Sequence, residues 1–300
     1  DVQGREIEAE WRAVEGSRFF GTPALYKENG FKKEEDAKAL IAGLMAEPPR
    51  AMMIEELAKK KEKKNPPLLF NLAELQNECS RLFKLSPDET LKVVQELYEK
   101  KLVTYPRTDA RVLSTAVAKE IYKNISGLRG FAPVSDFAKE VLEMGSYKNI
   151  AKTRYVNDKQ ITDHYAIVPT GQGLGALKSV SRMGFSVYTV IAKRFLSIFY
   201  PAAEYQKINL SVTKDKEHFF VSFKVLLSEG YLKVAGKPAD KSKEGEENEK
   251  IDKGFLELLK TLKKGISLPI KELYIKEGET TPPKRYNSGS MILAMENAGQ

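Results

Sequence analysis

The chain has 300 residues and 42% hydrophobic content, which is enough for two or three buried cores. Its net charge of +8, from 49 basic and 41 acidic side chains, gives a mixed surface whose basic bias suits a polyanionic partner. The single cysteine, Cys79, excludes an internal disulfide and a cysteine-based metal site. No apolar run approaches the roughly 20 residues of a membrane span, so we expect a cytoplasmic protein without membrane contact.

The N-terminal part of the chain has the alternation that is typical of strands. Residues 5–14 alternate polar and apolar side chains, which predicts a half-buried strand. The glutamates on its other face superficially resemble a metal-binding cluster, but that spacing is more often a solvated face, and we expect no metal there. Further strands are expected over 19–26 and 51–57, with a helix over 33–45 between them.

A lysine-rich run that ends in two prolines, residues 59–67, predicts an exposed linker and a domain boundary. The pattern then becomes helical. Asn71 is the expected cap of one helix, and residues 86–89, SPDE, predict the start of a second with a capping box and proline at its first position. This helix should end near Lys100, and with extended structure over 102–105 the pair resembles a helix-turn-helix followed by a wing.

The remaining elements follow from periodicity. Helical spacing predicts helices over 117–124, 134–144 and 186–199. Alternation predicts strands over 207–213, 219–226 and 230–234. Residues 237–253 are charged and lack a hydrophobic period, so they predict a mobile loop. After an extended stretch over 268–278, a last helix should be capped by Asn287 or Ser288.

Residues 100–111, KKLVTYPRTDAR, carry the strongest chemical signal. Pro106 pushes Tyr105 out of helical space, and two extended residues would place the Tyr105 phenol and the Arg107 guanidinium on one side. A phenol attacks poorly at neutral pH, and a fixed cation helps it to ionise and steadies charge on phosphate oxygens. On residue types alone, a surface turn with a half-buried tyrosine is the commoner alternative.

The same segment resembles the active-site segment of type IA DNA topoisomerases, in the Tyr-Pro-Arg form of the topoisomerase III branch. In that family a tyrosine attacks a single-strand phosphodiester and holds the 5′ phosphate covalently. The resemblance implies that Tyr105 is the nucleophile and that Arg107 is its partner at the scissile phosphate. It also implies DNA contacts by Thr108 and Asp109. Ala110 departs from a usual small polar residue, and we expect little effect from it.

Residues 157–170, NDKQITDHYAIVPT, resemble the family's Asp-His-x-Ala-Ile-x-Pro-Thr signature. A histidine can bind a phosphate when protonated or shuttle a proton near neutral pH. A lone histidine is more often a polar residue with a satisfied hydrogen bond, but the matching surroundings place His164 beside the scissile phosphate. The resemblance also implies a DNA contact by Lys159. His218, the other histidine, has no such context and receives no role.

A third and weaker motif, PPKRYNS over residues 282–288, resembles a family segment that contacts the single strand. Arg285 and Ser288 are the residues that would make these contacts. Asn287 stands near a usual threonine or serine, and Gly289 stands where the family tends to have a small residue. The departures weaken the match at this end of the chain.

The resemblance implies an α+β multidomain fold. Residues 1–66 and 190–275 would form a β-rich arch or hinge domain. Residues 67–189 would be an inserted helical, winged-helix-like domain that carries the catalytic tyrosine, and residues 276–300 would begin a truncated DNA-binding domain. The pairing of the two separated β-rich segments rests on the resemblance and not on periodicity.

The function implied is that of the central gate fragment of a type IA DNA topoisomerase: single-strand cleavage through a 5′-phosphotyrosine, strand passage and religation without ATP. Both ends look like cuts through a longer protein, and the Toprim domain, with its Mg²⁺ ligands, would be missing. We therefore expect Mg²⁺ in the whole enzyme but no metal site in these residues. We also expect a monomer that binds single-stranded DNA and docks the Toprim domain, without relaxation activity of its own.

Two other classes of function were weighed. The first is a non-catalytic single-strand DNA clamp that keeps the fold without the chemistry. The second, tyrosine recombinase-like chemistry, would need several scattered Arg and His residues that these motifs do not supply. Assay of DNA relaxation by a chain extended at its N-terminus would separate the enzyme from the clamp.

Overall fold

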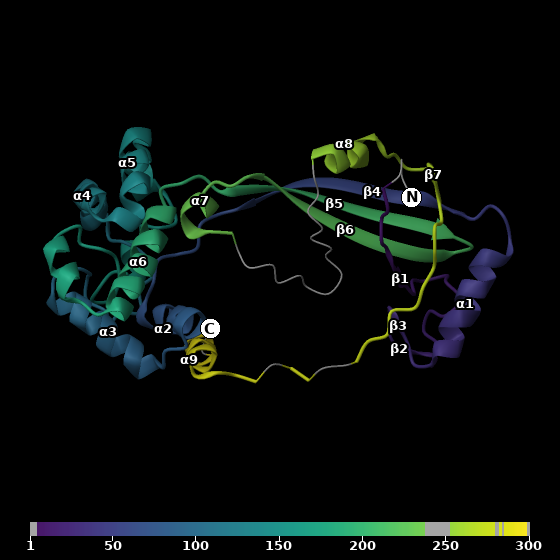
Figure 1. Cartoon of the computed structure of the whole chain (residues 1–300), viewed down its shortest axis with the longest axis horizontal. Coiled ribbons are helices and arrows are strands. Elements are labelled where there is room, and N and C mark those ends of the chain that lie inside the picture. The colour runs from purple at the N-terminus through teal and green to yellow at the C-terminus, as the bar shows by residue number, and fades with distance from the viewer. Residues whose placement is uncertain (1–4, 238–252, 280–281, 284, 299–300) are drawn as a thin grey trace. The chain divides into compact units, whose positions relative to one another are not determined.

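The computed structural model describes residues 5–237, 253–279, 282–283 and 285–298. The chain divides into two compact units, each of which collects separated segments of the sequence (Figure 1). The sheet unit consists of residues 1–63, 204–228 and 238–281. The helical unit consists of residues 64–203, 229–237 and 282–300. Among the described residues no helix is both long enough and apolar enough to cross a membrane.

The described part of the sheet unit is built on one five-stranded sheet in the order β1-β6-β5-β4-β7. Its strands are β1 (Glu10–Arg12), β4 (Ala51–Lys64), β5 (Ala203–Lys214), β6 (Glu217–Ser228) and β7 (Ser267–Pro269). The long β5–β6 hairpin is antiparallel and pairs from Glu204 with Ser228 to Lys214 with Glu217. A separate two-stranded ladder joins β2 (Leu25–Lys27) to β3 (Gly30–Phe31), and the helices are α1 (Glu34–Ala46) and α8 (Lys253–Thr261).

One apolar cluster fills the core of the sheet unit. Alternate residues of β4, β5 and β6 point into it, and Ile54, Ile208 and Phe223 are almost completely buried. Helix α8 lies along the sheet (Figure 1) and adds Phe255, whose ring meets that of Phe223 edge to face at 5.5 Å between centroids. The alternation of apolar and polar residues along these strands therefore indicates which side chains face this core.

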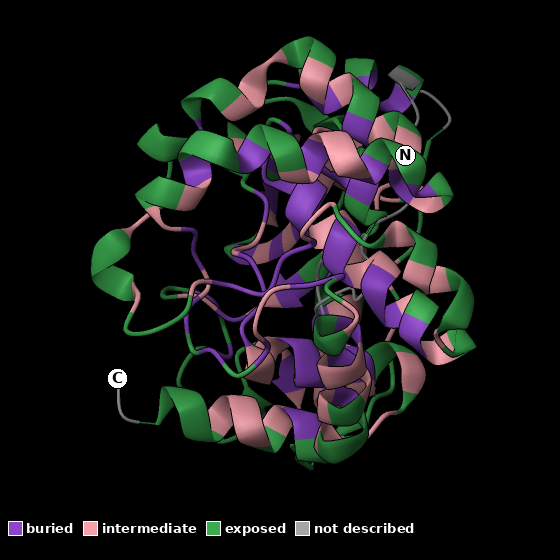
Figure 2. Cartoon of the chain, turned by 90° about the vertical axis from the view of Figure 1, so that its left-hand side faces the viewer, coloured by how far each residue is buried: buried purple, intermediate pink, exposed green. Residues whose placement is uncertain are grey.

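The helical unit packs its helices around extended segments. These helices are α2 (Leu72–Phe83), α3 (Pro87–Glu99), α4 (Thr115–Gly127), α5 (Ser135–Met144), α6 (Arg182–Ser197), α7 (Leu232–Ala235) and α9 (Ser288–Asn297). Short 3-10 helices cover Leu128–Gly130, Ala132–Val134, Ser146–Lys152, Asp158–Gln160 and Leu174–Ser179. Figure 2 shows buried residues on the inward helix faces and along the extended segments between them.

The helix starts predicted from capping residues are confirmed. The Asn71 side chain accepts a hydrogen bond from the backbone N–H of Glu74 at 2.9 Å. Ser86 and Glu89 form both halves of a capping box at the start of α3. Asn287, one of the two candidates, caps α9 by accepting from Ser290 N at 2.8 Å. These local signals are reliable because cap and helix lie within one turn of each other.

The predicted linker over 59–67 is wrong, because β4 continues as a strand to Lys64. Two of its charged side chains form ion pairs with residues of β5 and β6. Glu62 lies 3.0 Å from Lys224 Nζ, and Lys63 Nζ lies 3.0 Å from Glu204. The Lys224 ammonium lowers the pKa of Glu62. The charged run that resembles a solvated linker in the sequence is therefore part of a strand. Its ion-pair partners, Glu204 and Lys224, lie more than a hundred residues later in the chain.

Other predicted elements are shorter, shifted or of another kind. The strand over 5–14 is confirmed only as β1, and the strand over 19–26 only as β2, because turns occupy residues 15–24. The expected strand over 230–234 is wrong: residues 232–235 form α7. Gly230 permits this turn, since its φ is +48° and a Cβ would lie 2.5 Å from the carbonyl oxygens of Pro201 and Ala202.

Two further elements, α8 and α6, differ from expectation. Helix α8 has no counterpart among the predicted elements, although Phe255, Leu256 and Leu259 have helical spacing. Most of the predicted loop over 237–253 lies outside the described residues. Helix α6 runs through residue 189 without interruption, so the helical unit extends to Ala203.

Candidate active site

Three extended segments, residues 68–72, 102–113 and 164–170, cross inside the helical unit. They are joined by single bridges instead of a continuous ladder of strand pairs. Residues 102–113 pair with both other segments: Thr104 N donates to Val168 O, Thr170 N to Leu102 O and Ala166 N to Val112 O, and Leu69 N and Leu72 N donate to Arg111 O and Thr108 O, all at 3.0–3.1 Å. The other two segments also pair with each other, through Ile167 N to Phe70 O at 2.8 Å. The backbone is therefore held on both sides of Tyr105.

The crossing brings two of the predicted site residues into contact. The rings of Tyr105 and His164 lie 4.4 Å apart between centroids, tilted by 43°. Tyr105 is half-buried and His164 is exposed, so both side chains have access to solvent on one side. The phenol is also supported by the ring of Tyr98, which meets it edge to face at 5.4 Å. Two motifs far apart in sequence thus share one location.

Thr108 holds the His164 segment in place. Its hydroxyl donates to the carbonyl oxygen of His164 at 2.7 Å and accepts from Ala110 N at 3.1 Å. Only 6% of Thr108 is exposed, so the side chain lies behind the site and its hydrogen bonds are already used. The expected DNA contact by Thr108 therefore gives way to a supporting role.

Thr104, on the other side of Tyr105, has a matching arrangement. Its hydroxyl donates to Ala166 O at 2.9 Å and accepts from Val168 N at 3.0 Å. Each threonine hydroxyl donates to a backbone carbonyl of the segment that carries His164. The Thr104 hydroxyl also accepts from that segment, whereas the Thr108 hydroxyl accepts from Ala110, two residues further along its own segment. The register between Tyr105 and His164 is consequently set by two side chains as well as by backbone pairing.

Arg107, Asp109 and Lys159 are exposed, as contacts to a strand would require. The carbonyl oxygen of Asp109 accepts from Asn71 Nδ2 at 3.1 Å, and the same amide donates to Glu296 of α9 at 2.5 Å. The loop around Asp109 is thereby tied both to the start of α2 and to α9.

The turn that carries Lys159 is held at the start of α4. Asp158 accepts from the hydroxyl of Thr115 at 2.6 Å and from its backbone N–H at 2.8 Å. These two hydrogen bonds lower the pKa of Asp158. Because the carboxylate is engaged with the helix, the neighbouring Lys159 is the residue of this turn that is free to face an anion.

Arg285 and Ser288 are exposed at the start of α9, which packs against α2. Gly289 permits the close approach, since a Cβ there would lie 3.0 Å from both Asn77 Cα and Ser80 Cβ. Within the described ranges, no hydrogen bond or ring contact joins Arg285 or Ser288 to Tyr105 or His164. The structure therefore brings Tyr105 and His164 of the first two motifs into contact, while helix α9, which follows the third motif, is connected through Asn71 to the backbone of Asp109.

An open pocket of about 540 Å³ begins at Tyr105 and His164. Its other lining residues come from the end of α3, the segment before Tyr105 and the segment after His164: Tyr98, Glu99, Lys101, Val103, Thr104, Tyr165 and Thr170. Of these, Tyr98 and Tyr165 were not among the site residues predicted from the sequence. For Tyr98 the sequence contained one signal: a tyrosine in the last turn of a predicted helix that is followed by an extended segment.

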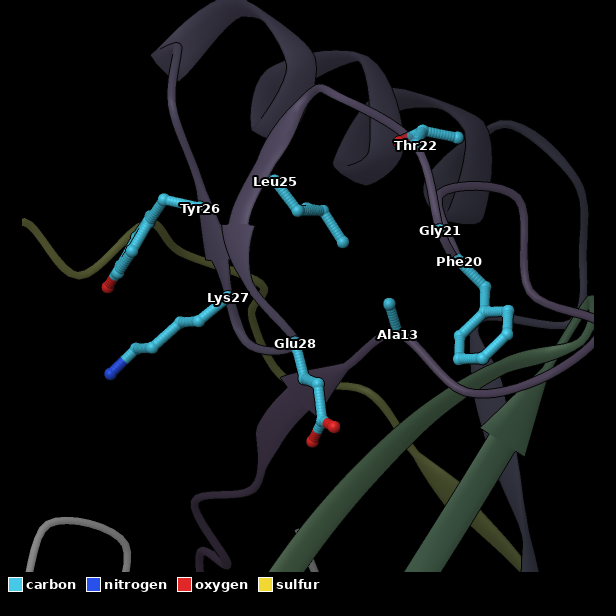
Figure 3. Close-up of a pocket in the computed structure, with 8 residues that line it drawn as sticks. All are labelled: Ala13, Phe20, Gly21, Thr22, Leu25, Tyr26, Lys27 and Glu28. Carbon is cyan, nitrogen blue, oxygen red and sulfur yellow. The ribbon is translucent and has the colours of Figure 1, made fainter.

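A second pocket, of about 280 Å³, lies in the sheet unit (Figure 3). Leu25 points into it, while Tyr26 and Lys27 point away, and Ala13 and Phe20 form the apolar wall. Glu28 is the only acid among its lining residues, and no motif predicted from the sequence lines it.

The acidic side chains of the described residues form no metal centre. No group of three or more His, Cys, Asp or Glu that could hold an ion occurs in that part of the chain. The Mg²⁺ that the resemblance implies therefore does not fit a site among these residues.

The fold and the paired motifs define a class of protein, the type IA DNA topoisomerases. A family model described as DNA topoisomerase matches residues 6–299, and the chain belongs to this family. The resemblance found in the sequence is confirmed.

Within the family the chain is most like DNA topoisomerase 3. DNA topoisomerase 3 of Bacillus subtilis (strain 168) is 36% identical over 248 residues, which are 82% of this chain and 32% of that protein. DNA topoisomerase 3 of Bacillus licheniformis is 36% identical over 246 residues, with the same two shares. The chain thus spans about a third of the length of these relatives.

A solved structure shares the fold. Full-length topoisomerase I from Thermotoga maritima superposes with a TM-score of 0.61 and 22% sequence identity, covering 91% of this chain and 41% of that one. At this identity the likeness concerns the fold, and it supports the α+β class expected from the sequence.

Proposed function

We propose that this chain is the strand-cleaving gate of a type IA DNA topoisomerase, with Tyr105 as the nucleophile toward single-stranded DNA. The observation that carries the proposal is the contact between Tyr105 and His164, 4.4 Å apart between ring centroids. A phenol and an imidazole from two separate motifs meet at the mouth of an open pocket. Their partner Arg107 is exposed two residues from the phenol.

The reaction is a transesterification. The phenol of Tyr105 gives up its proton and its oxygen attacks the phosphorus atom. The bond to the 3′ oxygen of the preceding nucleotide breaks, that oxygen takes up a proton and leaves as a 3′ hydroxyl, and the 5′ phosphate stays on the tyrosine. Arg107 grips the phosphate oxygens as negative charge grows on them. His164 binds the same phosphate or moves a proton near it. The new phosphodiester conserves the energy of the broken bond, so the 3′ hydroxyl can reverse the reaction without ATP.

The remaining exposed residues are proposed to guide the strand. Asp109, Lys159, Arg285 and Ser288 are candidates for contacts with the DNA, and Thr108 holds His164 from behind. Contacts with phosphates make binding fall as salt rises, because counterions are released from the strand. We propose that the single strand binds more tightly than a blunt duplex of equal length.

The sheet unit is proposed to act as the arch and hinge that lets the helical unit move while the strand is open. The Toprim domain of the family would supply Mg²⁺ and hold the other end of the cut strand. We propose a monomer that needs this domain for strand relaxation. These assignments come from the family.

Covalent capture tests the proposal. The chain, a separately purified Toprim-containing fragment and Mg²⁺ are mixed with a single-stranded oligonucleotide labelled at its 3′ end. A labelled protein band should survive denaturation for the unaltered chain and for Tyr122→Phe, the matched control at an exposed tyrosine of α4. Tyr105→Phe should bind the strand and form no band, because only the attacking oxygen is lost. Arg107→Ala should bind but react slowly, and His164→Ala should weaken both binding and cleavage.

The outcomes separate enzyme from clamp. A Tyr105→Phe chain that still forms the band at the normal rate contradicts the assignment of the nucleophile. A chain that binds single strands tightly but never forms the band in this mixture is the non-catalytic clamp.

A further inference from the structure

The pocket at Tyr105 extends beyond the residues that the proposed cleavage uses. Tyr98, Val103 and Tyr165 line it but have no part in attack or in charge stabilisation. Tyr98 lies in the last turn of α3, where its ring contacts that of Tyr105 and 38% of its surface is exposed. An exposed ring next to the reacting group is a feature that the chemistry at the phosphate leaves unexplained.

The floor and walls of this pocket are apolar and aromatic. Val103, which is 1% exposed, is one of the lining residues, and the Thr104 hydroxyl is already occupied by Ala166 and Val168. Tyr98 and Tyr165 supply rings, and burial raises the pKa of the Tyr165 phenol, so it remains a neutral group that can donate a hydrogen bond. Such a surface suits a flat, neutral, aromatic ligand.

The rim is polar and held in place. Glu99 and Lys101 are exposed at the mouth. Lys101 has a left-handed backbone with φ of 62°, and its carbonyl oxygen accepts from the Thr170 hydroxyl at 2.6 Å. A carboxylate and an ammonium at one edge can pair with the hydrogen-bonding groups of a base while its face packs on the rings.

We propose that this pocket binds the base of the nucleotide whose 5′ phosphate becomes joined to Tyr105. The inference rests on the proposed function. A strand with its phosphate at the phenol must place the adjoining sugar and base next to the Tyr105 ring, where the pocket begins. The volume of about 540 Å³ lies within the range of roughly 300–1,000 Å³ that is usual for small-molecule sites. Stacking on tyrosine tolerates any base, which fits a site without sequence readout.

The subsite would also serve resealing. A base packed against Tyr98 keeps the covalently held nucleotide from turning about its phosphodiester. The phosphorus then stays in line for attack by the returning 3′ hydroxyl. Loss of the ring should therefore slow religation in addition to weakening binding.

The test compares strands with and without bases. The 300-residue chain is titrated with a thymidine oligonucleotide of about 12 nucleotides and with the same sugar–phosphate backbone from which every base is absent. Tyr98→Ala should weaken binding of the thymidine strand roughly five- to tenfold and leave binding of the base-free strand unchanged. Tyr98→Phe keeps the ring and should bind both strands normally. Tyr122→Ala, at another exposed tyrosine of the same unit, should change neither affinity.

Each outcome has one reading. Equal weakening on both strands means that Tyr98 only supports Tyr105, and this overturns the subsite while the proposed function stands. Unchanged binding of the thymidine strand to Tyr98→Ala overturns it as well. Failure of the unaltered chain to bind either strand overturns the proposed function itself. Photo-crosslinking with a 5-iodouracil strand should label Tyr98 or Tyr165, and labelling confined to other residues counts against the subsite.

Discussion

The two units of this protein are held together in different ways. In the sheet unit, long strands share a regular ladder, and alternate side chains fill one apolar cluster. In the helical unit, the extended segments around Tyr105 cross at single bridges, and the side chains of Asn71, Thr104 and Thr108 complete their hydrogen bonding. The sheet depends on a repeated pattern, whereas the candidate active site depends on individual polar groups.

Charged side chains withdrawn from solvent show the same contrast. Glu217 of the sheet unit, 3% exposed, accepts from Trp11 Nε1 and from Arg18 N, both at 2.8 Å, and fixes the N-terminal segment to β6. The half-buried Arg194 of α6 lies 4.0 Å from the Phe70 ring centroid and donates to Leu68 O at 2.9 Å, next to the extended segments. Desolvation lowers the pKa of Arg194. Glu217 fastens an edge of the sheet, and Arg194 supports the crossing.

The largest expected effect on stability belongs to the sheet core. Phe223→Ala should lower the free energy of unfolding by about 3–5 kcal/mol, because the ring is almost fully buried and leaves a cavity. Leu227→Ala, at a residue of the same strand with 43% of its surface exposed, is the matched control and should change it little. Urea unfolding followed by circular dichroism measures both. A loss for Phe223→Ala no greater than for the control would contradict a regular, tightly packed core.

Cys79 sharpens this test, because it reports on the helical unit alone. Burial raises the pKa of its thiol to about 12, so the native thiol is protonated at neutral pH and should react slowly with maleimide. Phe223→Ala should leave that rate unchanged, whereas Leu75→Ala, in the core beside Cys79 on α2, should raise it. Equal acceleration by both substitutions would show that the two cores open together.

A smaller effect on stability, with a larger one on function, is expected at Thr108. Thr108→Val keeps the shape but leaves the His164 carbonyl and the Ala110 N–H without this partner, which should cost about 1–3 kcal/mol. The covalent adduct should form more slowly, since His164 is no longer held against Tyr105. Thr108→Ser should restore both quantities, and Thr162→Val, at an exposed threonine nearby in sequence, should alter neither. Normal cleavage by Thr108→Val would mean that backbone pairing alone sets the register.

The smallest effect concerns Asp158 and pH. Its pKa is lower in the folded chain than the ordinary 3.8, so the unfolded chain binds its proton first as pH falls. The stabilisation is therefore complete above 3.8 and is lost as pH drops through the lower folded value. Asp158→Asn should flatten the dependence of unfolding free energy on pH in this window. Identical pH profiles for Asp158→Asn and the unaltered chain would contradict the Thr115 hydrogen bonds.

Much of the fold follows from local sequence signals. Asn71, Ser86 and Asn287 cap helices where expected, because a cap and its helix are neighbours in the chain. The two motifs around Tyr105 and His164 were recognisable from their residues. Their resemblance to type IA topoisomerases also predicted that they belong to one site.

The rest depends on partners that are distant in sequence. The lysine run of β4 looks like a linker until Glu204 and Lys224 are placed beside it. Thr108 looks like a DNA contact until the carbonyl of His164 takes its hydroxyl. Tyr98 has the spacing of a core residue, and only the turn after α3 brings its ring to Tyr105. These pairs of residues cannot be predicted from the periodicity or the composition of the sequence.

The central claim is that Tyr105 becomes joined to the 5′ phosphate of the cut strand, and peptide mapping of the covalent adduct tests it most directly. Adduct formed with the Toprim-containing fragment is digested with protease and nuclease, and the modified peptide is sequenced by mass spectrometry. We predict a nucleotide 5′ phosphate on Tyr105, in a complex that retains a 3′ label and releases a 5′ label. A nucleotide on any other residue, or retention of the 5′ label, would contradict the account.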